Sequence, residues 1–485
     1  MSRTLVGPFN RVEGDLEVSL DIQQGRVRSA QVNSPLYRGF EQILQGKAPM
    51  DALVYTPRIC GICSVSQSVA CAWALADAMQ LPSPPNGDRC ISLVLANENL
   101  ADLLTHFYLF FMPDFAREIY GKESWFDEVN KRFKAVQGDA TREVLPARAE
   151  FLHMMGLLAG KWPHSLSIQP GGTAKPIQAQ ERLRLLAILA GFRRFLETRL
   201  FGADLEQIAE LNSEAALRNW ADQAAWYSSD LRTFLHLSDQ LDLASLGNGS
   251  DHFMSYGTYR IDGVRQFDAG TRRRGGQVLA LDSASIREDL SHSWMVQNGG
   301  QPQHPSSGKT EPSLDNPDGY SWCKAPRLAG EVVETGALAR QYINGHPLIV
   351  DLVENSGGNV RNRMIARLLE LALVVPMMQQ WVKEIDLNEP FCNHGTLPDV
   401  ASGVGMMEAA RGSLGHWLSV RRGKIENYQV IAPTTWNFSP RDHNEVPGPL
   451  EQALEGAPVR DGEKDPVSVQ HIVRSFDPCM VCTVH

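Results

Sequence analysis

The chain has 485 residues, of which 43% are hydrophobic and 21% are charged, so its composition is that of a folded globular protein and not of a disordered or collagen-like chain. Its 56 acidic and 46 basic side chains give a formal net charge of −10, without the cationic surface that nucleic acids and anionic membranes attract. Apolar runs such as Leu371 to Met378 are shorter than the roughly 20 residues of a membrane span, and no signal-peptide pattern begins at Met1. We therefore expect a soluble, cytoplasmic protein with no membrane span and no nucleic-acid partner.

The first 35 residues alternate apolar and polar side chains. The apolar positions include Leu16, Val18, Leu20 and Ile22, and a turn pattern follows at Gln23 to Gly25. This alternation predicts a small β-hairpin over about residues 1–35.

From Ala48 onward the apolar spacing is mostly three to four residues, which predicts long helices over segments such as 100–111, 183–189 and 364–371. A stretch rich in Gly, Pro, Ser and Asn predicts a surface loop over about residues 298–319. No internal repeat and no Rossmann or P-loop glycine pattern is present. We expect one domain over residues 1–485, mainly α with small β portions, of the α+β class.

Four of the eight cysteines form two Cys-x-x-Cys pairs, Cys60/Cys63 and Cys479/Cys482. The spacing alone fits a structural zinc site, a redox dithiol or another thiolate-bound metal centre, and it does not choose among them. A structural metal is the commonest use of four thiolates. Because most of the chain separates the pairs, a metal that they share would tie the two terminal regions together across the core.

The residues around the pairs, Arg58-Ile59-Cys60-Gly61-Ile62-Cys63 and Asp477-Pro478-Cys479-Met480-Val481-Cys482-Thr483-Val484-His485, resemble the large subunit of [NiFe]-hydrogenases. Further segments that resemble this family follow along the whole chain: Arg11-Val12-Glu13-Gly14, Arg38-Gly39-Phe40-Glu41, Trp162-Pro163-His164, Tyr320-Ser321-Trp322, Lys324-Ala325-Pro326-Arg327, Ala409-Ala410-Arg411-Gly412 and Pro433-Thr434-Thr435-Trp436-Asn437. The resemblance implies the helical-core fold of that subunit and displaces the structural zinc interpretation.

In that family four thiolates hold nickel, and two of them bridge to an iron that carries carbon monoxide and cyanide. Carried over by position, Cys60 and Cys479 would bind nickel alone, and Cys63 and Cys482 would bridge the two metals. Soft thiolates suit nickel. Heterolytic cleavage of H2 also needs a base beside the metals, and the resemblance implies a terminal thiolate, Cys479, or a nearby guanidine.

The resemblance also implies roles for polar residues near the metals. Arg411 would lie over the nickel, held by Asp102 and Asp477 through charge-assisted hydrogen bonds. Arg411 and Thr434 could both hydrogen-bond an iron-bound cyanide. Glu13 would be the proton exit, since a buried carboxyl group near a thiolate has a raised pKa and can take up a proton and pass it on.

Two further groups are implied, a second metal and a partner chain. Glu41 and His485 resemble ligands of a structural metal, usually magnesium, with a backbone carbonyl near Val430 or Ile431 as a third ligand. The chain has no spare cysteine set for an iron–sulfur cluster, so electrons must leave through another subunit. We expect an iron–sulfur small subunit, in a heterodimer or a dimer of heterodimers.

Gln67 stands four residues after Cys63, where relatives built for turnover usually carry histidine. Glutamine does not titrate near neutral pH, so a hydrogen bond can persist there but a proton-linked role cannot. This glutamine, and a sequence that ends at His485 without the extension that turnover-type subunits usually carry when first made, resemble the H2-sensing regulatory branch. We expect a slow hydrogenase that reports H2 to a histidine kinase. The alternative is an uptake or bidirectional hydrogenase of energy metabolism.

Overall fold

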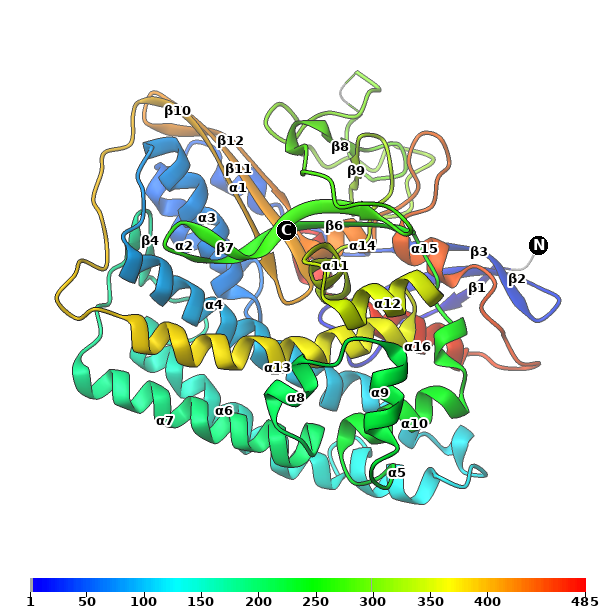
Figure 1. Ribbon diagram of the computed structural model, residues 1–485. Coiled ribbons are helices and arrows are strands. Elements are labelled where there is room, and N and C mark those ends of the chain that lie inside the picture. The colour runs from blue at the N-terminus through cyan, green and yellow to red at the C-terminus, as the bar shows by residue number, and fades with distance from the viewer. Residues whose placement is uncertain (1–2, 298) are drawn as a thin grey trace.

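The elements lie in layers around a long central helix in the computed structural model, which describes residues 3–297 and 299–485 (Figure 1). Helix α13 (Val360–Glu384) crosses the middle of the molecule. Helices α6 (Asp139–Ala159) and α7 (Ala179–Phe195) lie below it in the view, and a sheet that spans residues 400–431 lies above it.

The N-terminal region forms an antiparallel sheet of three strands, β1 (Arg3–Val6), β2 (Glu17–Gln23) and β3 (Arg26–Asn33). The predicted hairpin is present as β2 and β3, and β1 adds an edge strand that the sequence analysis did not predict. Val18 and Leu20 of β2 are fully buried. Their alternation with more exposed residues is the period-two pattern on which the prediction was based.

Helices dominate the middle of the chain, which confirms the predicted fold class. The three predicted helical segments lie in α4, which continues into a π-helical segment (His106–Phe111), and in α7 and α13. The remaining α-helices, named with their bounds, are α1 (Phe40–Leu44), α2 (Ala52–Tyr55), α3 (Ser64–Met79), α4 (Pro85–Thr105), α5 (Phe126–Phe133), α8 (Leu205–Ala209), α9 (Glu214–Ala221), α10 (Asp230–Gln240), α11 (Ala337–Ile343), α12 (Pro347–Ser356), α14 (Pro433–Asn437), α15 (Pro449–Leu454), α16 (Val467–Ser475) and α17 (Met480–Thr483).

The sequence analysis did not predict the strands beyond residue 160. These strands are β4 (Ile168–Gln169), β5 (Gly172–Thr173), β6 (His252–Ile261), β7 (Val264–Arg273), β8 (Ile286–Asp289), β9 (Ala325–Leu328), β10 (Val400–Ala409), β11 (Gly412–Arg421) and β12 (Lys424–Ile431). Strands β6 and β11 are buried along almost their whole length, so both of their faces are covered. A strand buried on both faces does not show the alternation that a sequence search detects.

Two glycines let α3 pack directly against β10. A Cβ added at Gly403 would lie 2.0 Å from the carbonyl oxygen of Ala74, and one added at Gly405 would lie 1.9 Å from that of Ala70. These distances are far below any normal contact, so only glycine permits the approach. The close packing fixes the start of α3, which follows Cys63, relative to the end of β10, which precedes Arg411.

Helix α13 is, among the described residues, the one helix long and apolar enough to cross a membrane by length and composition. The sequence analysis considered only uninterrupted apolar runs and did not identify it. The rest of the protein buries 72% of its most apolar window, and α13 packs against α4, α7 and α11. This burial is typical of the central helix of a globular protein.

The predicted surface loop is only partly at the surface. Asn298 lies outside the described residues, and residues 299–319 contain no helix or extended strand. Thr310, however, is buried and donates a hydrogen bond to the side chain of Gln429 on β12 (3.0 Å). The loop therefore sends one polar side chain into the interior, and the composition pattern gave no sign of this.

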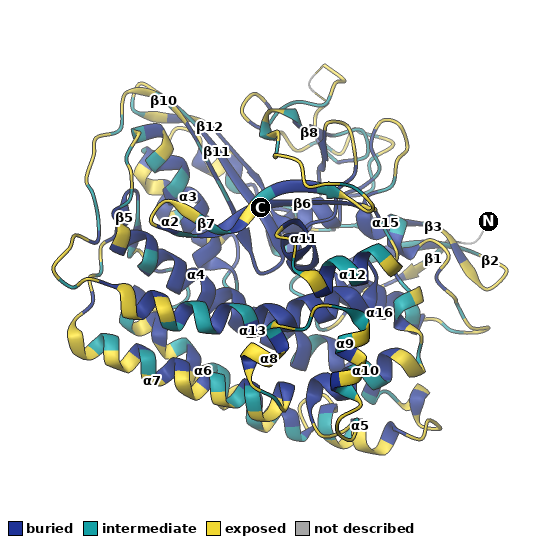
Figure 2. Cartoon of the chain, in the orientation of Figure 1, coloured by how far each residue is buried: buried dark blue, intermediate teal, exposed yellow. Residues whose placement is uncertain are grey.

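The two ends of the chain differ in burial (Figure 2). The C-terminal end lies in the interior among buried residues, whereas the N-terminal sheet extends to one side of the molecule. His485 is only 3% exposed.

Gly405→Ala tests the packing of α3 on β10. The added methyl group must displace the backbone of α3, so we expect a loss of about 1–3 kcal/mol in the free energy of unfolding, measured by urea denaturation. Gly191→Ala is the matched control, because an added Cβ at this exposed position of α7 meets no atom within 4 Å. It should stabilise the protein by about 0.5–1 kcal/mol. Equal stability of Gly405→Ala and the unchanged protein would contradict the close approach.

Candidate metal centre

The four cysteines of the two Cys-x-x-Cys pairs meet in the interior. The sulfur atoms lie 3.5 Å apart in Cys60 and Cys479, 3.1 Å apart in Cys63 and Cys482, and 2.9 Å apart in Cys479 and Cys482. All four sulfurs lie within 4.8 Å of one another, and none of the four residues is more than 8% exposed. The sequence prediction that the two ends of the chain converge on one set of thiols is confirmed.

Each pair is shaped by the short turn before a helix. Cys63 immediately precedes α3, and its backbone N–H donates to the sulfur of Cys60 (3.4 Å). Cys479 immediately precedes α17, and the N–H of Cys482 donates to the carbonyl oxygen of Cys479 (3.1 Å). The chain turns tightly within each pair, so both sulfurs of a pair face the same side.

Backbone bonds and one arginine join the N-terminal and C-terminal segments. The N–H of Met480 donates to the carbonyl oxygen of Glu13 (2.7 Å). The guanidinium of Arg38 donates to the carbonyl oxygens of Ile59 and Val481, each one residue before a metal-site cysteine. Arg38 thus holds the two cysteine turns at a fixed separation. The sequence analysis saw it only as part of a motif and assigned it no role.

Arg411 lies beside the thiols in a fully buried ion network. Its guanidinium donates to the carboxylate of Asp102 (2.5 and 3.2 Å) and to that of Asp477 (3.2 Å), and its Nε donates to the Asp477 backbone carbonyl (3.0 Å). These are the two acids that the sequence analysis expected to hold Arg411. Burial by itself lowers the pKa of a guanidinium, but Asp102 and Asp477 hold the pKa of Arg411 well above its usual value, so its proton is firmly held.

Glu13 lies half-buried near the thiols and forms a backbone bridge with Cys479. Burial and the charge of Cys60 raise the pKa of Glu13, while Arg411 and Arg38 oppose the shift. A carboxyl group with a raised pKa and a partly exposed position can exchange protons with both the interior and the solvent.

A small cavity opens beside Cys63 and Cys482, and Gln67, Arg411 and Thr434 are among the residues that line it. Gln67 is fully buried, and its Oε1 lies 2.8 Å from Nε2 of His416, whose Nδ1 lies 2.7 Å from the Tyr428 hydroxyl. Burial lowers the pKa of His416 to about 3, so the neutral ring donates to Gln67 and accepts from Tyr428. Thr434 accepts a hydrogen bond from the backbone N–H of Cys479 (3.0 Å).

The arrangement fits a soft metal centre. Four thiols this close cannot all ionise without a cation between them, and hydrogen bonds from the other thiols and burial raise the pKa of Cys63 well above its usual value. Among the described residues, Nε2 of Gln67 and Oδ2 of Asp477 are buried polar atoms without a hydrogen-bond partner. An acceptor carried by a metal at the thiols would give the Gln67 amide a partner, whereas the Asp477 oxygen is itself an acceptor and needs a donor. The donor set therefore fits a soft metal, and a small cavity adjoins the thiols.

Glu41 and His485 meet in a second buried cluster. Nε2 of His485 lies 3.2 Å from Oε1 of Glu41, and the Nδ1 side of the ring faces the carbonyl oxygen of Cys482 (2.7 Å). Lys324 lies in the same cluster, with its ammonium 3.3 Å from Glu41 and 2.8 Å from Glu288. Although burial alone would raise it, Lys324 and His485 lower the pKa of Glu41 to about 2.

The residues expected to supply the third ligand lie next to this cluster. The backbone N–H of Val430 donates a hydrogen bond to the carboxylate of Glu41 (2.7 Å). The group that contacts this carboxylate is therefore the amide nitrogen of Val430 and not the carbonyl of Ile431. Ile431 is fully buried in β12. Glu41, Glu288 and His485 bring two carboxyl groups and one imidazole together, which are donor types that a divalent cation can use.

Sequence reasoning missed two buried groups that position the centre. Glu98 accepts hydrogen bonds from the backbone N–H groups of Val65 and Ser66 (2.9 Å each) and so caps the first turn of α3. Arg340 donates to the carbonyl oxygens of Ala409 (2.8 Å) and Ala410 (3.1 Å), the residues before Arg411. A lone Glu or Arg in a helical pattern is normally assigned to the surface, so no sequence signal marked either residue.

A family model described as nickel-dependent hydrogenase matches residues 38–120 and 141–485 of the chain. The chain is 28% identical to the periplasmic [NiFeSe] hydrogenase large subunit of Desulfomicrobium baculatum, across 99% of this chain and 94% of that protein. It is 27% identical to the hydrogenase-2 large chain of Escherichia coli K12 (100% and 97% covered) and 28% identical to the uptake hydrogenase large subunit of Azotobacter chroococcum (100% and 95% covered).

Solved structures agree in fold over the whole chain. An H2-activated [NiFeSe]-hydrogenase from Dm. baculatum superposes with a TM-score of 0.86 at 26% identity, and the match covers 100% of both chains. The Ni-Fe-Se hydrogenase of D. vulgaris Hildenborough in its as-isolated oxidised state gives the same TM-score and identity over the same coverage.

Arg38→Gln tests the link between the two cysteine turns. Loss of the two charge-assisted hydrogen bonds should lower the free energy of unfolding by about 2 kcal/mol and speed hydrogen exchange at the amides of residues 480–484. Arg58→Gln is the control, because that exposed guanidinium donates only to the carbonyl oxygen of Val54 in its own turn. Equal exchange at residues 480–484 in both variants would show that Arg38 does not join the segments.

Proposed function

The chain belongs to the nickel-dependent hydrogenase family and is a hydrogenase large subunit, and on this premise we propose that Cys60, Cys63, Cys479 and Cys482 hold a nickel–iron centre whose iron carries carbon monoxide and cyanide. The observation that carries the proposal is the meeting of four buried thiols beside a buried arginine that is paired with two acids. When bound, the metal pair supplies the site at which H2 is cleaved. Cys60, Cys63, Cys479 and Cys482 would hold this pair through their sulfur atoms, with Cys60 and Cys479 as ligands of nickel and Cys63 and Cys482 as ligands shared with iron.

The residues around the thiols have different roles in moving the proton that cleavage of H2 releases. Arg411 keeps its proton because Asp102 and Asp477 pair with it, so it orients groups in the cavity by donating hydrogen bonds and does not act as the base. Thr434 and Gln67 line the same cavity and hold polar ligands there. The base is then the sulfur of Cys479, whose backbone is joined to Glu13. Glu13 receives the proton and releases it toward solvent.

Electrons leave through a partner in this proposal. Among the residues described, the four thiols are the only group of three or more His, Cys, Asp and Glu side chains whose ligand atoms lie together, and no second cysteine cluster stands beside them to carry electrons. Exposed apolar side chains gather on the segment that leads to Cys60, namely Leu36, Ile43, Met50 and Val54, which are 49%, 43%, 41% and 38% exposed. They suit the docking of an iron–sulfur small subunit next to the centre. The cytoplasmic location expected from the sequence stays a prediction.

A structural magnesium site belongs to the same proposal. Glu41 and Nε2 of His485 face each other in a buried cluster, and Ile431 lies on the adjoining strand end. A divalent cation there, held by Glu41, His485 and the carbonyl of Ile431, would fix the C-terminal residues that follow Cys482.

We place the reaction in energy metabolism, as an uptake or bidirectional hydrogenase. The names of the relatives support this role, since they include uptake hydrogenases and hydrogenase-2. The chain also extends over 94–97% of the length of the first relatives, as expected of a subunit with the same overall task.

H2 sensing is the second candidate, and one contact favours it. Gln67 occupies the position four residues after Cys63 and is hydrogen-bonded to a neutral His416, so no titratable group faces the bridging thiols there. An enzyme that lacks a proton-linked group at this position suits a slow detector that passes its state to a histidine kinase.

The rate of H2 oxidation with a viologen dye, measured on the nickel-loaded complex with its small subunit, separates these roles. A metabolic enzyme should turn over at about 10–1,000 s⁻¹, the usual range for enzymes, and should co-purify without a kinase. Turnover slower by about two orders of magnitude, together with a co-purifying histidine kinase, would reverse the assignment in favour of sensing. No H2 oxidation at all in a nickel-loaded complex would overturn the hydrogenase proposal.

Glu13→Gln tests the proton exit. The amide keeps the shape of the side chain but cannot carry a proton, so we expect H2 oxidation to fall about 10²-fold or more while the nickel and iron contents stay unchanged. Asp15→Asn is the control, because it removes an exposed acid two residues away. If Glu13→Gln retains full activity, or if Asp15→Asn loses as much, protons leave by another route.

A further inference from the structure

Two arginines face each other at the tip of the β6–β7 hairpin. Arg260 and Arg265 are direct cross-strand partners, and Ile261 and Val264 close the hairpin next to them. Residues directly opposite in an antiparallel pair project from the same face, so the two cations are neighbours. Like charges in this position destabilise a hairpin, so an anion bound between the two guanidinium groups would stabilise it.

The hairpin tip is held firmly in place. Its turn residues Asp262 and Gly263 have positive φ angles of 51° and 81°, the conformation of a tight two-residue turn. Asp262 pairs with Arg89 (2.8 Å), and the N–H of Gly263 donates to Asp88 (3.1 Å) at the start of α4. These two contacts tie the tip of the hairpin to the start of α4.

Neither guanidinium has a carboxylate partner among the residues that the structure describes. No side-chain hydrogen bond and no ion pair within 4.0 Å is formed by Arg260 or Arg265, and Nε of Arg265 is buried without a partner. Arg260 stacks on the indole ring of Trp73 at 4.3 Å. Asp268 and Asp88 are close enough to act on the two charges, but neither forms an ion pair with them.

The two arginines line a cavity of about 340 Å³ between the hairpin, α3 and β10. Asp77 also lines it, but this carboxylate accepts the backbone N–H of Val404 (2.9 Å). Gly257 makes room for Arg265, because a Cβ at this position would lie 2.6 Å from Cδ of Arg265. The rest of the lining is largely apolar and includes Leu81, Pro82, Val404 and Met406.

We propose that this cavity, here named the Arg260–Arg265 pocket, binds a small phosphorylated molecule whose phosphoryl group lies between Arg260 and Arg265 and whose body packs on the apolar lining and the edge of Trp73. Two guanidinium forks present more N–H donors and more positive charge than a carboxylate can use. A phosphate monoester, with three terminal oxygens and nearly two negative charges, matches both forks.

The pocket is separate from the metal centre. The cavity beside Cys63 and the Arg260–Arg265 pocket share no residue. Trp73 lies nine residues along α3 from its first residue, Ser64, a distance of about 14 Å along the helix axis. The proposal therefore does not depend on metal loading, and failure of either proposal leaves the other standing.

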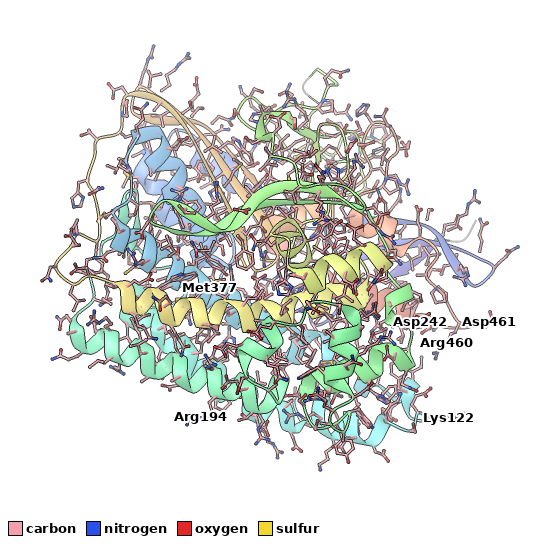
Figure 3. All side chains as sticks on the ribbon, in the orientation of Figure 1. Lys122, Arg194, Asp242, Met377, Arg460 and Asp461 are labelled. Atoms are coloured by element: carbon pink, nitrogen blue, oxygen red, sulfur yellow. The ribbon has the colours of Figure 1, made fainter. Side chains whose placement is uncertain are left out.

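Isothermal titration of the purified complex with phenyl phosphate tests the proposal. We expect saturable binding. The affinity should fall about tenfold or more in Arg260→Gln and in Arg265→Gln, because each variant loses the charge-assisted hydrogen bonds of one guanidinium with the phosphoryl group. The control is Arg194→Gln, which removes an exposed arginine on α7, at the edge of the molecule far from the hairpin in Figure 3. That variant should bind phenyl phosphate like the unchanged protein.

Two further measurements test the proposal, the binding of benzoate and the unfolding temperature of a ligand-free variant. Benzoate should bind at least about tenfold more weakly than phenyl phosphate, because a carboxylate satisfies only one guanidinium. Without any ligand, Arg265→Gln should unfold at the same or a higher temperature than the unchanged protein, because it removes the repulsion of like charges. Absence of saturable binding, equal binding of benzoate, equal loss in Arg194→Gln, or a lower unfolding temperature of ligand-free Arg265→Gln would each overturn the proposal.

Discussion

The structure depends on one constraint, that four sulfur atoms from the two ends of a 485-residue chain lie within 4.8 Å of one another. The surrounding contacts serve this convergence. Arg38 bonds to both cysteine turns, and the backbone of Glu13 bonds to that of Met480. The C-terminal residues must pass into the interior to bring Cys479 and Cys482 there, which is why His485 is buried although chain ends are usually exposed.

Several charged side chains are buried around the four sulfur atoms, and the convergence of these sulfurs in the interior explains why. A centre of thiolates in the interior needs nearby groups that carry protons and charge, and each of these must be paired to remain buried. Arg411 is paired with Asp102 and Asp477, and Arg340, paired with Glu370 and Glu408, holds the backbone before Arg411. These pairs fix the position of Arg411 beside the thiols.

The sequence predicted much of this and missed the rest for physical reasons. The helical core follows from apolar spacing, and the cysteine pairs and the network of Arg411 follow from local motifs. The sheet of β10, β11 and β12 was missed because its central strand is buried on both faces. His416 and Glu98 were missed because the importance of a buried polar residue lies in its long-range partners, Gln67 in one case and the start of α3 in the other.

The central claim is that these four thiols bind nickel together with iron. Metal analysis of the purified complex, combined with nickel X-ray absorption spectroscopy, tests it most directly. The account predicts one nickel per large subunit in a sulfur-rich environment with an iron atom at close range. Zinc in place of nickel in correctly matured protein, or nickel bound mainly by nitrogen and oxygen, would contradict it.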